Sequence, residues 1–407
     1  MRHYFKVLRS RGVARLLFSQ LAARFPTGML AIGLLVHIEQ TYGNYTVAGL
    51  VLAAFGIAQG IAGPLGGRLM SRFGMRGILV PTMFVCAAAL AIIAVVPMPT
   101  WLIAVVAFVA GLTVPPVGPA VRTVYPTLVR GPKLVTLFSF DATLQELIWI
   151  LGPIVAIGVG ALWGTSLTIL IAAVVLLIGS AWFVSAPTMG VVKIPASPRR
   201  MGSVLRNPVV VIMCIVLMLT MSIWGAIDAS IVAHYGHDSP ITGVILAVSA
   251  VGSFTGGLLT GNLPMRRTSL TARVALAVVG VLLALLLAES PWLLAIALFI
   301  AGASCAPVVA VANASVSASV RFSDTAEAFG WLATAIMFGS SFASSLAGIA
   351  IDHLGAKGGL YVATGLVAAA FLVAIATLRR HPDLRHASLE PQADTGAAPI
   401  IDLRQEI

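Results

Sequence analysis

One stretch of the chain carries the residues best suited to chemistry. Residues 140–153 read FDATLQELIWILGP and lie inside a long apolar run. They include two carboxylates, Asp141 and Glu146, followed by Gly152-Pro153. An ionisable group inside a segment of hydrocarbon length is costly to bury and is a functional candidate by default. A proline inside a helix leaves a carbonyl unpaired and bends the axis. These features indicate a working helix of a membrane protein.

The two carboxylates are expected to do different work. At a rise of 1.5 Å per residue, Asp141 and Glu146 lie about 12 and 18 Å from the start of their helix. Five residues of separation turn them roughly 140° apart, so a regular helix cannot aim both at one small site. Glu146 is nearer the middle of the membrane and is the better candidate for proton exchange. Asp141 is the better candidate for a structural ion pair, and static pairing of both carboxylates is the alternative.

Arg24 is a cation at a comparable depth. It lies about ten residues into the first apolar run, just before Pro26. A lone guanidinium there needs a partner, which Asp141 or Glu146 could supply. Binding of an anionic part of a substrate is the second possibility.

Two further carboxylates lie in later apolar runs. Asp228 is an intramembrane charge in the seventh run. Glu327 lies near the start of the eleventh and could pair with Arg321 or Arg122 at a gate. It could equally be a helix-start carboxylate after residues 323–325.

The composition identifies the environment of these residues. Of the 407 residues, 59% are hydrophobic and 10% are charged. A soluble globular protein has about 25% charged residues, so this chain has too little polar surface to be one. The three cysteines are widely spaced and show no metal or disulfide pattern. We expect an all-α integral membrane protein.

Twelve apolar runs are long enough to cross a bilayer, which needs about 20 residues per helix. Their approximate limits are 15–39, 46–69, 77–97, 101–127, 134–160, 165–187, 208–235, 241–262, 269–288, 291–319, 325–350 and 358–378.

The basic residues predict the orientation. With the N-terminus in the cytoplasm, every lysine and arginine except Lys357 and the intramembrane Arg24 falls at a cytoplasmic segment. This is the asymmetry that the positive-inside rule describes, and it places both termini inside. It also accounts for the formal charge of +11 without nucleic acid. The 21 arginines against four lysines suggest a bacterial source, and we therefore expect a multi-pass protein of the cell (inner) membrane.

The chain divides into two similar halves. A six-helix bundle over 1–187 and another over 208–378 are separated by a cytoplasmic linker at 188–207, and a polar tail at 379–407 is expected to be disordered. Residues 47–69 resemble 241–263, and 107–117 resemble 298–308, with Pro116 matching Pro307. Such parallel repeats are one known transporter plan, with the substrate site at their interface.

The segment GRLMSRFGMR, residues 67–76, resembles the signature of the major facilitator superfamily. Gly67, Arg72, Gly74 and Arg76 match it, whereas Ser71 replaces the usual aspartate. The resemblance implies two pseudo-repeated six-helix bundles and a gating role for this loop. A plain basic loop is the alternative reading.

The same resemblance suggests roles for other residues. Gly152-Pro153 is similar to the antiporter motif of the family, and small residues there also let helices pack closely. Arg122 resembles the arginine of span 4 and joins the gating candidates with Glu327; snorkelling to the membrane interface is the alternative. Spans 1, 4, 7 and 10 line the cavity in this family. That implies substrate contacts for Trp224, Asp228 and Asn313, the repeat partner of Arg122.

We therefore expect a secondary transporter that works by alternating access and exports a small, partly apolar compound in exchange for protons. An importer of a sugar or metabolite and a non-transporting membrane receptor or assembly partner are the alternatives. No nucleotide-binding loop or catalytic triad is visible in the sequence, so we expect no enzyme activity, no cofactor and no resident metal. We expect a monomer whose partners are its substrate, protons and lipid.

Overall fold

The structure is a computed structural model, and it describes residues 7–10, 12–43, 45–192, 195, 200–236, 240–261, 263–384 and 391–392. Helices predominate because a bilayer offers no water to the backbone, and a helix satisfies its hydrogen bonds within itself. The helices are α2 (Val13–Tyr42), α3 (Tyr45–Phe73), α4 (Met75–Val95), α5 (Thr100–Leu112), α6 (Val117–Leu128), α7 (Pro132–Trp163), α8 (Thr165–Val184), α9 (Pro187–Val191), α10 (Pro208–Tyr235), α11 (Pro240–Thr260), α12 (Ser269–Leu286), α13 (Pro291–Gly302), α14 (Cys305–Ser319), α15 (Thr325–Leu354) and α16 (Gly358–Ala376).

The twelve predicted spans are confirmed, since the described chain contains twelve helical segments long and apolar enough to cross a membrane. Span 4 consists of α5 and α6, and span 10 of α13 and α14. Both are interrupted near the matching prolines Pro116 and Pro307. A proline cannot donate the backbone hydrogen bond that a continuous helix needs. The repeat seen in the sequence thus appears as the same break in both halves.

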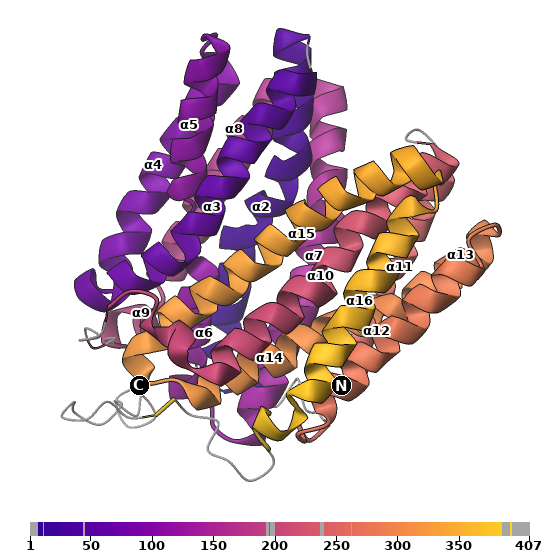
Figure 1. Cartoon of the computed structure of the whole chain (residues 1–407). Helices are drawn as coiled ribbons and strands as arrows, with labels where there is room; N and C mark the ends of the chain where they lie inside the picture. The colour runs from indigo at the N-terminus through magenta and orange to yellow at the C-terminus, as the bar shows by residue number, and fades with distance from the viewer. Residues whose placement is uncertain are drawn as a thin grey trace.

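The first half, α2–α8, lies beside the second half, α10–α16 (Figure 1). We call the surface that carries Arg72, Lys133, Arg206, Arg266 and Arg379 the basic face, and the other end of the helices the opposite face.

The seam is the contact surface between the halves, where α3 packs on α15 and α7 packs on α11 and α14. Its contacts lie in the parts of these helices nearer the basic face. Phe138 of α7 lies 6.2 Å, between ring centroids, from Phe329 of α15. Farther along, a Cβ added at Gly56 or Gly348 would meet no described atom within 4 Å. The halves therefore join at the basic face and separate toward the opposite face, as Figure 1 shows for the helices.

Segments outside the spans reinforce the basic face. Asn207 Nδ2 donates to Ser319 O at 2.7 Å. Gln392 pairs with the connection between α14 and α15, where its N–H donates to Val320 O at 2.9 Å. Most of the segment 379–407, for which we expect disorder, lies outside the described residues, as do residues 193, 194 and 196–199 of the linker.

An exposed ion pair lies at the opposite face of the second half. Lys357 Nζ lies 2.6 Å from Glu289 Oε1. The hydrogen bond to Lys357 lowers the pKa of Glu289, and the same bond raises the pKa of Lys357. Lys357, which lies at this face, is thus paired within the protein.

Candidate functional site

A buried network of polar side chains surrounds Asp141. The carboxylate is fully buried, and its Oδ2 lies 3.3 Å from Arg122 Nε in an ion pair. Its Oδ1 accepts from Gln20 Nε2 at 2.8 Å and from the Tyr125 hydroxyl at 3.2 Å. These contacts come from α2, α6 and α7, and they satisfy a charge that would otherwise be very costly to bury. Asp141 is therefore held in a buried ion pair with Arg122, and this pairing accounts for the position of Arg122 without snorkelling.

The prediction that Arg24 pairs with a carboxylate is wrong in this conformation. Arg24 Nη1 donates to Gln20 Oε1 at 3.2 Å. The amide of Gln145 lies between two guanidinium groups: its oxygen accepts either from Arg122 Nη2 or, with the amide turned over, from Arg24. Arg24 is thus bound by neutral amides, because Arg122 already occupies Asp141.

Glu146 lies apart from this network and at the seam. Its Oε1 lies 3.7 Å from Cys305 Sγ, the first residue of α14 in the second half. The Ser253 hydroxyl of α11 is also within hydrogen-bonding reach of the carboxyl group. No ion pair to Glu146 occurs among the described residues. Glu146 is half-buried, so this uncompensated carboxyl group contacts the other half of the molecule and remains reachable.

The three predicted cavity residues have different surroundings. Asp228 is exposed along α10, and Trp224, one turn earlier, is half-buried. Asn313 is 1% exposed, and its Nδ2 has no hydrogen-bond partner within the described part of the chain. The structure thus places Asn313 in the packed interior of the second half, whereas the acid and the indole of α10 are accessible.

The signature-like segment 67–76 has two parts: the first contacts α15, and the second forms the turn between α3 and α4. Gly67 lies inside α3, where an added Cβ would approach Glu327 N to 2.7 Å, so glycine permits the contact between α3 and α15. The turn itself is made at Gly74, with φ +79°. Arg72 and Arg76 are exposed, and the Arg72 guanidinium lies over the Phe73 ring, 5.4 Å from its centroid.

The ion pair across the seam involves Arg68 rather than the basic residues predicted for it. Arg68 Nη1 lies 3.8 Å from Glu327 Oε2, and Glu327 is 2% exposed. Glu327 Oε1 also accepts from Gly202 N, in the segment that joins the halves, at 2.6 Å. Arg122 is not its partner, because it is bound to Asp141, and no ion pair between Glu327 and Arg321 occurs among the described residues. Glu327 therefore links both halves and their connection at the basic face.

Gly152 supports the packing interpretation of Gly152-Pro153. A Cβ at Gly152 would lie 2.7 Å from Gly28 Cα, so α7 and α2 meet backbone to backbone there. Helix α7 does not end at Pro153 but continues through it.

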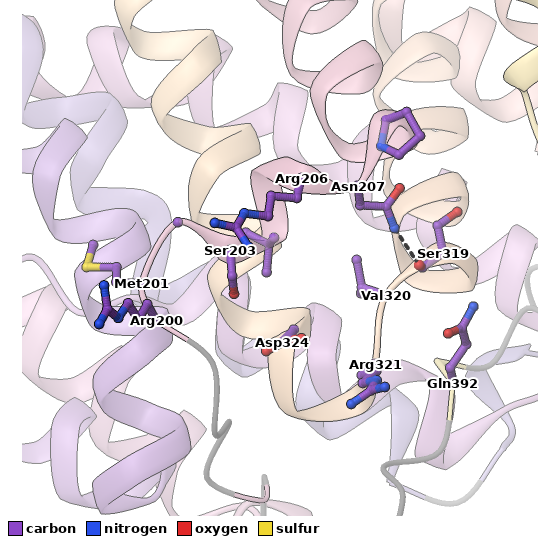
Figure 2. A pocket seen from close by; sticks show the side chains of 13 residues that line it. Arg200, Met201, Ser203, Arg206, Asn207, Ser319, Val320, Arg321, Asp324 and Gln392 are labelled. Carbon is purple, nitrogen blue, oxygen red and sulfur yellow. Dashed lines mark hydrogen bonds between the residues drawn. The ribbon is translucent and has the colours of Figure 1, made fainter.

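The structure also contains a pocket of about 930 Å³, whose lining does not include Asp141, Glu146 or Asp228. It opens at the basic face between residues 200–208 and 319–324, with Gln392 at its edge (Figure 2). Its position beneath α10 and α14 separates it from Glu146 and Asp228, which lie deeper in the spans, so we do not assign the transport site to it.

Sequence reasoning missed the polar residues that complete the network, namely Gln20, Tyr125 and Gln145, and the partners across the seam, Arg68 and Cys305. Gln20 and Gln145 are amides inside apolar runs, and that signal could have found them.

Comparisons with known proteins agree with this architecture. A sequence profile of the Major Facilitator Superfamily matches residues 16–263 and 209–405. The fold is similar to the crystal structure of a bacterial homologue of the iron transporter ferroportin in an outward-facing state, with a TM-score of 0.70 and 13% identity over 90% of this chain and 99% of that one. A second structure of a bacterial ferroportin homologue, outward-facing and with soaked iron, gives a TM-score of 0.68 and 14% identity over 89% and 98% of the two chains. No individually curated sequence matched.

The chain belongs to the Major Facilitator Superfamily. It is a multi-pass membrane transporter, and at 13–14% identity the likeness to the solved structures extends to the fold alone.

Proposed function

We propose that the protein exports a small, partly apolar compound in exchange for protons, by alternating access of a site between its halves. The observation that carries this proposal is the position of Glu146. It is a carboxyl group at the seam, next to Cys305 of the other half, with no ion pair among the described residues. When the halves move apart at the seam, this group loses its contacts and changes its access to water, as a proton carrier must.

The difference between the contacts of Asp141 and Glu146 supports Glu146 as the proton carrier. Asp141 is fixed by Arg122, Gln20 and Tyr125, all within the first half. Motion of one half against the other leaves those contacts in place. Glu146 is the carboxyl group of α7 whose surroundings depend on the conformation.

We assign the basic face to the cytoplasm, because basic residues concentrate in cytoplasmic segments. With that orientation the seam closes the cytoplasmic side and the halves separate toward the outside. Asp228 and Trp224 then contact the substrate from α10, and the monomer is the working unit in a bacterial inner membrane. The direction of transport rests on Gly152-Pro153, whose resemblance is to antiporters.

A two-stage experiment tests this function. A growth screen of an overexpressing strain against a compound panel first identifies a transported compound. Everted vesicles with an acidic interior and a trapped pH indicator then receive that compound. Wild type should take it up and release protons from the interior, whereas Glu146→Gln should lose proton-driven uptake and keep its elution profile on size exclusion. A compound that accumulates with no change of internal pH would contradict proton coupling.

The same assay separates the roles of the acids. Glu146→Gln should still exchange labelled compound for unlabelled compound without a pH gradient. If this variant retains full gradient-driven uptake, the proton is carried elsewhere, and Asp228→Asn becomes the next variant to examine.

A further inference from the structure

Donor atoms from both halves meet around the sulfur of Cys305. Cys305 Sγ lies 3.5 Å from Met221 Sδ of α10 and 3.7 Å from Glu146 Oε1 of α7. The Ser253 hydroxyl and the Trp224 indole also lie within hydrogen-bonding reach of the sulfur. A thioether and a carboxyl group thus each lie next to the Cys305 thiol, although the three residues come from distant parts of the sequence.

The separations match those between the ligands of a small metal ion. A tetrahedral ion with metal–sulfur bonds of about 2.3 Å and metal–oxygen bonds of about 2.1 Å holds neighbouring ligand atoms about 3.6–3.8 Å apart. The two distances at Cys305 fall close to that range. An ion could therefore bind here with side-chain adjustments alone.

The donor types select the class of ion. Thiolate and thioether are soft ligands and favour Cu(I) over hard cations such as Mg²⁺. Cys305 is the first residue of α14, at the break between the two helices of span 10. Binding would form a Cu–S bond to Cys305 and release its thiol proton to solvent.

We propose that Cys305, Met221 and Glu146 form a binding site for a soft metal ion, Cu(I) foremost, that joins α7 of the first half to α10 and α14 of the second. The described part of the chain has no group of three His, Cys, Asp or Glu side chains suited to a metal, so this site depends on the thioether of Met221. It shares Glu146 with the proposed proton site but requires neither proton coupling nor export. A bound ion would bridge the seam and hold the halves in this arrangement.

Cu(I) binding to the purified full-length protein tests the site. The protein in detergent competes anaerobically for Cu(I) with a chromophoric chelator, and no pH gradient is present, so the result is independent of the proposed transport function. Wild type should withhold one Cu(I) per chain and melt at a higher temperature with the ion bound. Cys305→Ser should bind roughly tenfold more weakly or worse.

Two other free cysteines provide matched controls. Cys86 of α4 and Cys214 of α10 lie elsewhere, and Cys86→Ser and Cys214→Ser should leave Cu(I) affinity unchanged. Met221→Leu, a substitution of similar volume, should also weaken binding and covers the case in which Cys305→Ser does not fold. If wild type leaves all Cu(I) on the chelator, or if Met221→Leu binds as tightly as wild type, the proposal is overturned.

Discussion

Glu327 of α15 and Arg68 of α3 face each other across the seam with 3.8 Å between their charged atoms. The carboxylate is buried, whereas Arg68 is 23% exposed, so water screens the pair only in part. Because α3 and α15 belong to different halves, this contact exists only while the basic face is closed.

Removal of this pair should favour opening at the basic face. Glu327→Gln keeps the shape of the side chain and removes its charge, which we expect to cost the closed state about 1–2 kcal/mol, or roughly a tenfold change in population. A cysteine placed at Thr143, which lies at the seam against Gly257, reports the change through its reaction with an impermeant maleimide added from the basic face. Lys133→Ala removes an exposed charge from the same face and should leave labelling unchanged. Equal labelling of Glu327→Gln and wild type would show that the pair does not hold the gate.

The ion pair within the first half should matter for stability rather than gating. Asp141→Asn leaves the Arg122 guanidinium buried without a counter-charge, which typically costs about 3–5 kcal/mol. Unfolding in mixed detergent should show this loss. The double variant Asp141→Asn with Arg122→Gln should recover part of it, because the buried Arg122 charge is then removed as well. A double variant less stable than Asp141→Asn would argue against a coupled pair.

A larger side chain at the glycine contact between α3 and α15 should separate the halves. A Cβ at Gly330 would lie 2.5 Å from the carbonyl carbon of Gly63, too near for any side chain. Gly330→Val should therefore raise maleimide labelling at the Thr143 cysteine or lower the yield of folded protein. Gly348→Val is the matched control on the same helix, since a side chain there meets open space. Wild-type labelling and yield for Gly330→Val would contradict the packing described at the seam.

Acid should loosen the contact at His381. Its ring nitrogens lie 3.2 Å from Arg267 O and 3.0 Å from Thr377 Oγ1, and burial lowers the pKa of the imidazole. A lowered pKa means that the folded state resists protonation. The contact therefore contributes fully above the ordinary histidine pKa near 6.5, and the contribution falls as the pH drops below about 6.5. Melting temperatures on either side of that pH should show a smaller acid-induced loss for His381→Gln than for wild type. The same loss in both proteins would exclude the histidine as the cause.

Hydropathy and charge were enough to predict the spans, because a bilayer imposes one length and one backbone structure on each of them. The twofold repeat was also visible, since Pro116 and Pro307 interrupt equivalent spans. The different surroundings of Asp141 and Glu146 were expected from helix geometry, because residues of one helix keep a fixed angular relation.

Pairing between helices could not be predicted in the same way. Whether Asp141 binds Arg24 or Arg122 depends on the rotation of three helices about their axes, which hydropathy leaves open. The pair between Arg68 and Glu327 depends in addition on how the two halves close. Cys305 seemed unremarkable in sequence because its neighbours, Met221 and Glu146, come from other helices.

The meeting of Gly63 and Gly330 has a mechanical consequence. Two rigid bodies that rock against each other need a contact about which they turn. Here that contact is made by main-chain atoms. Main-chain atoms have no rotamers to rearrange. The two helices can therefore change their angle at this contact without a change of side-chain rotamer there. In the proposed alternating access, the ion pair at Glu327 holds the basic face closed, and the contact between the two glycines is the point about which the halves turn.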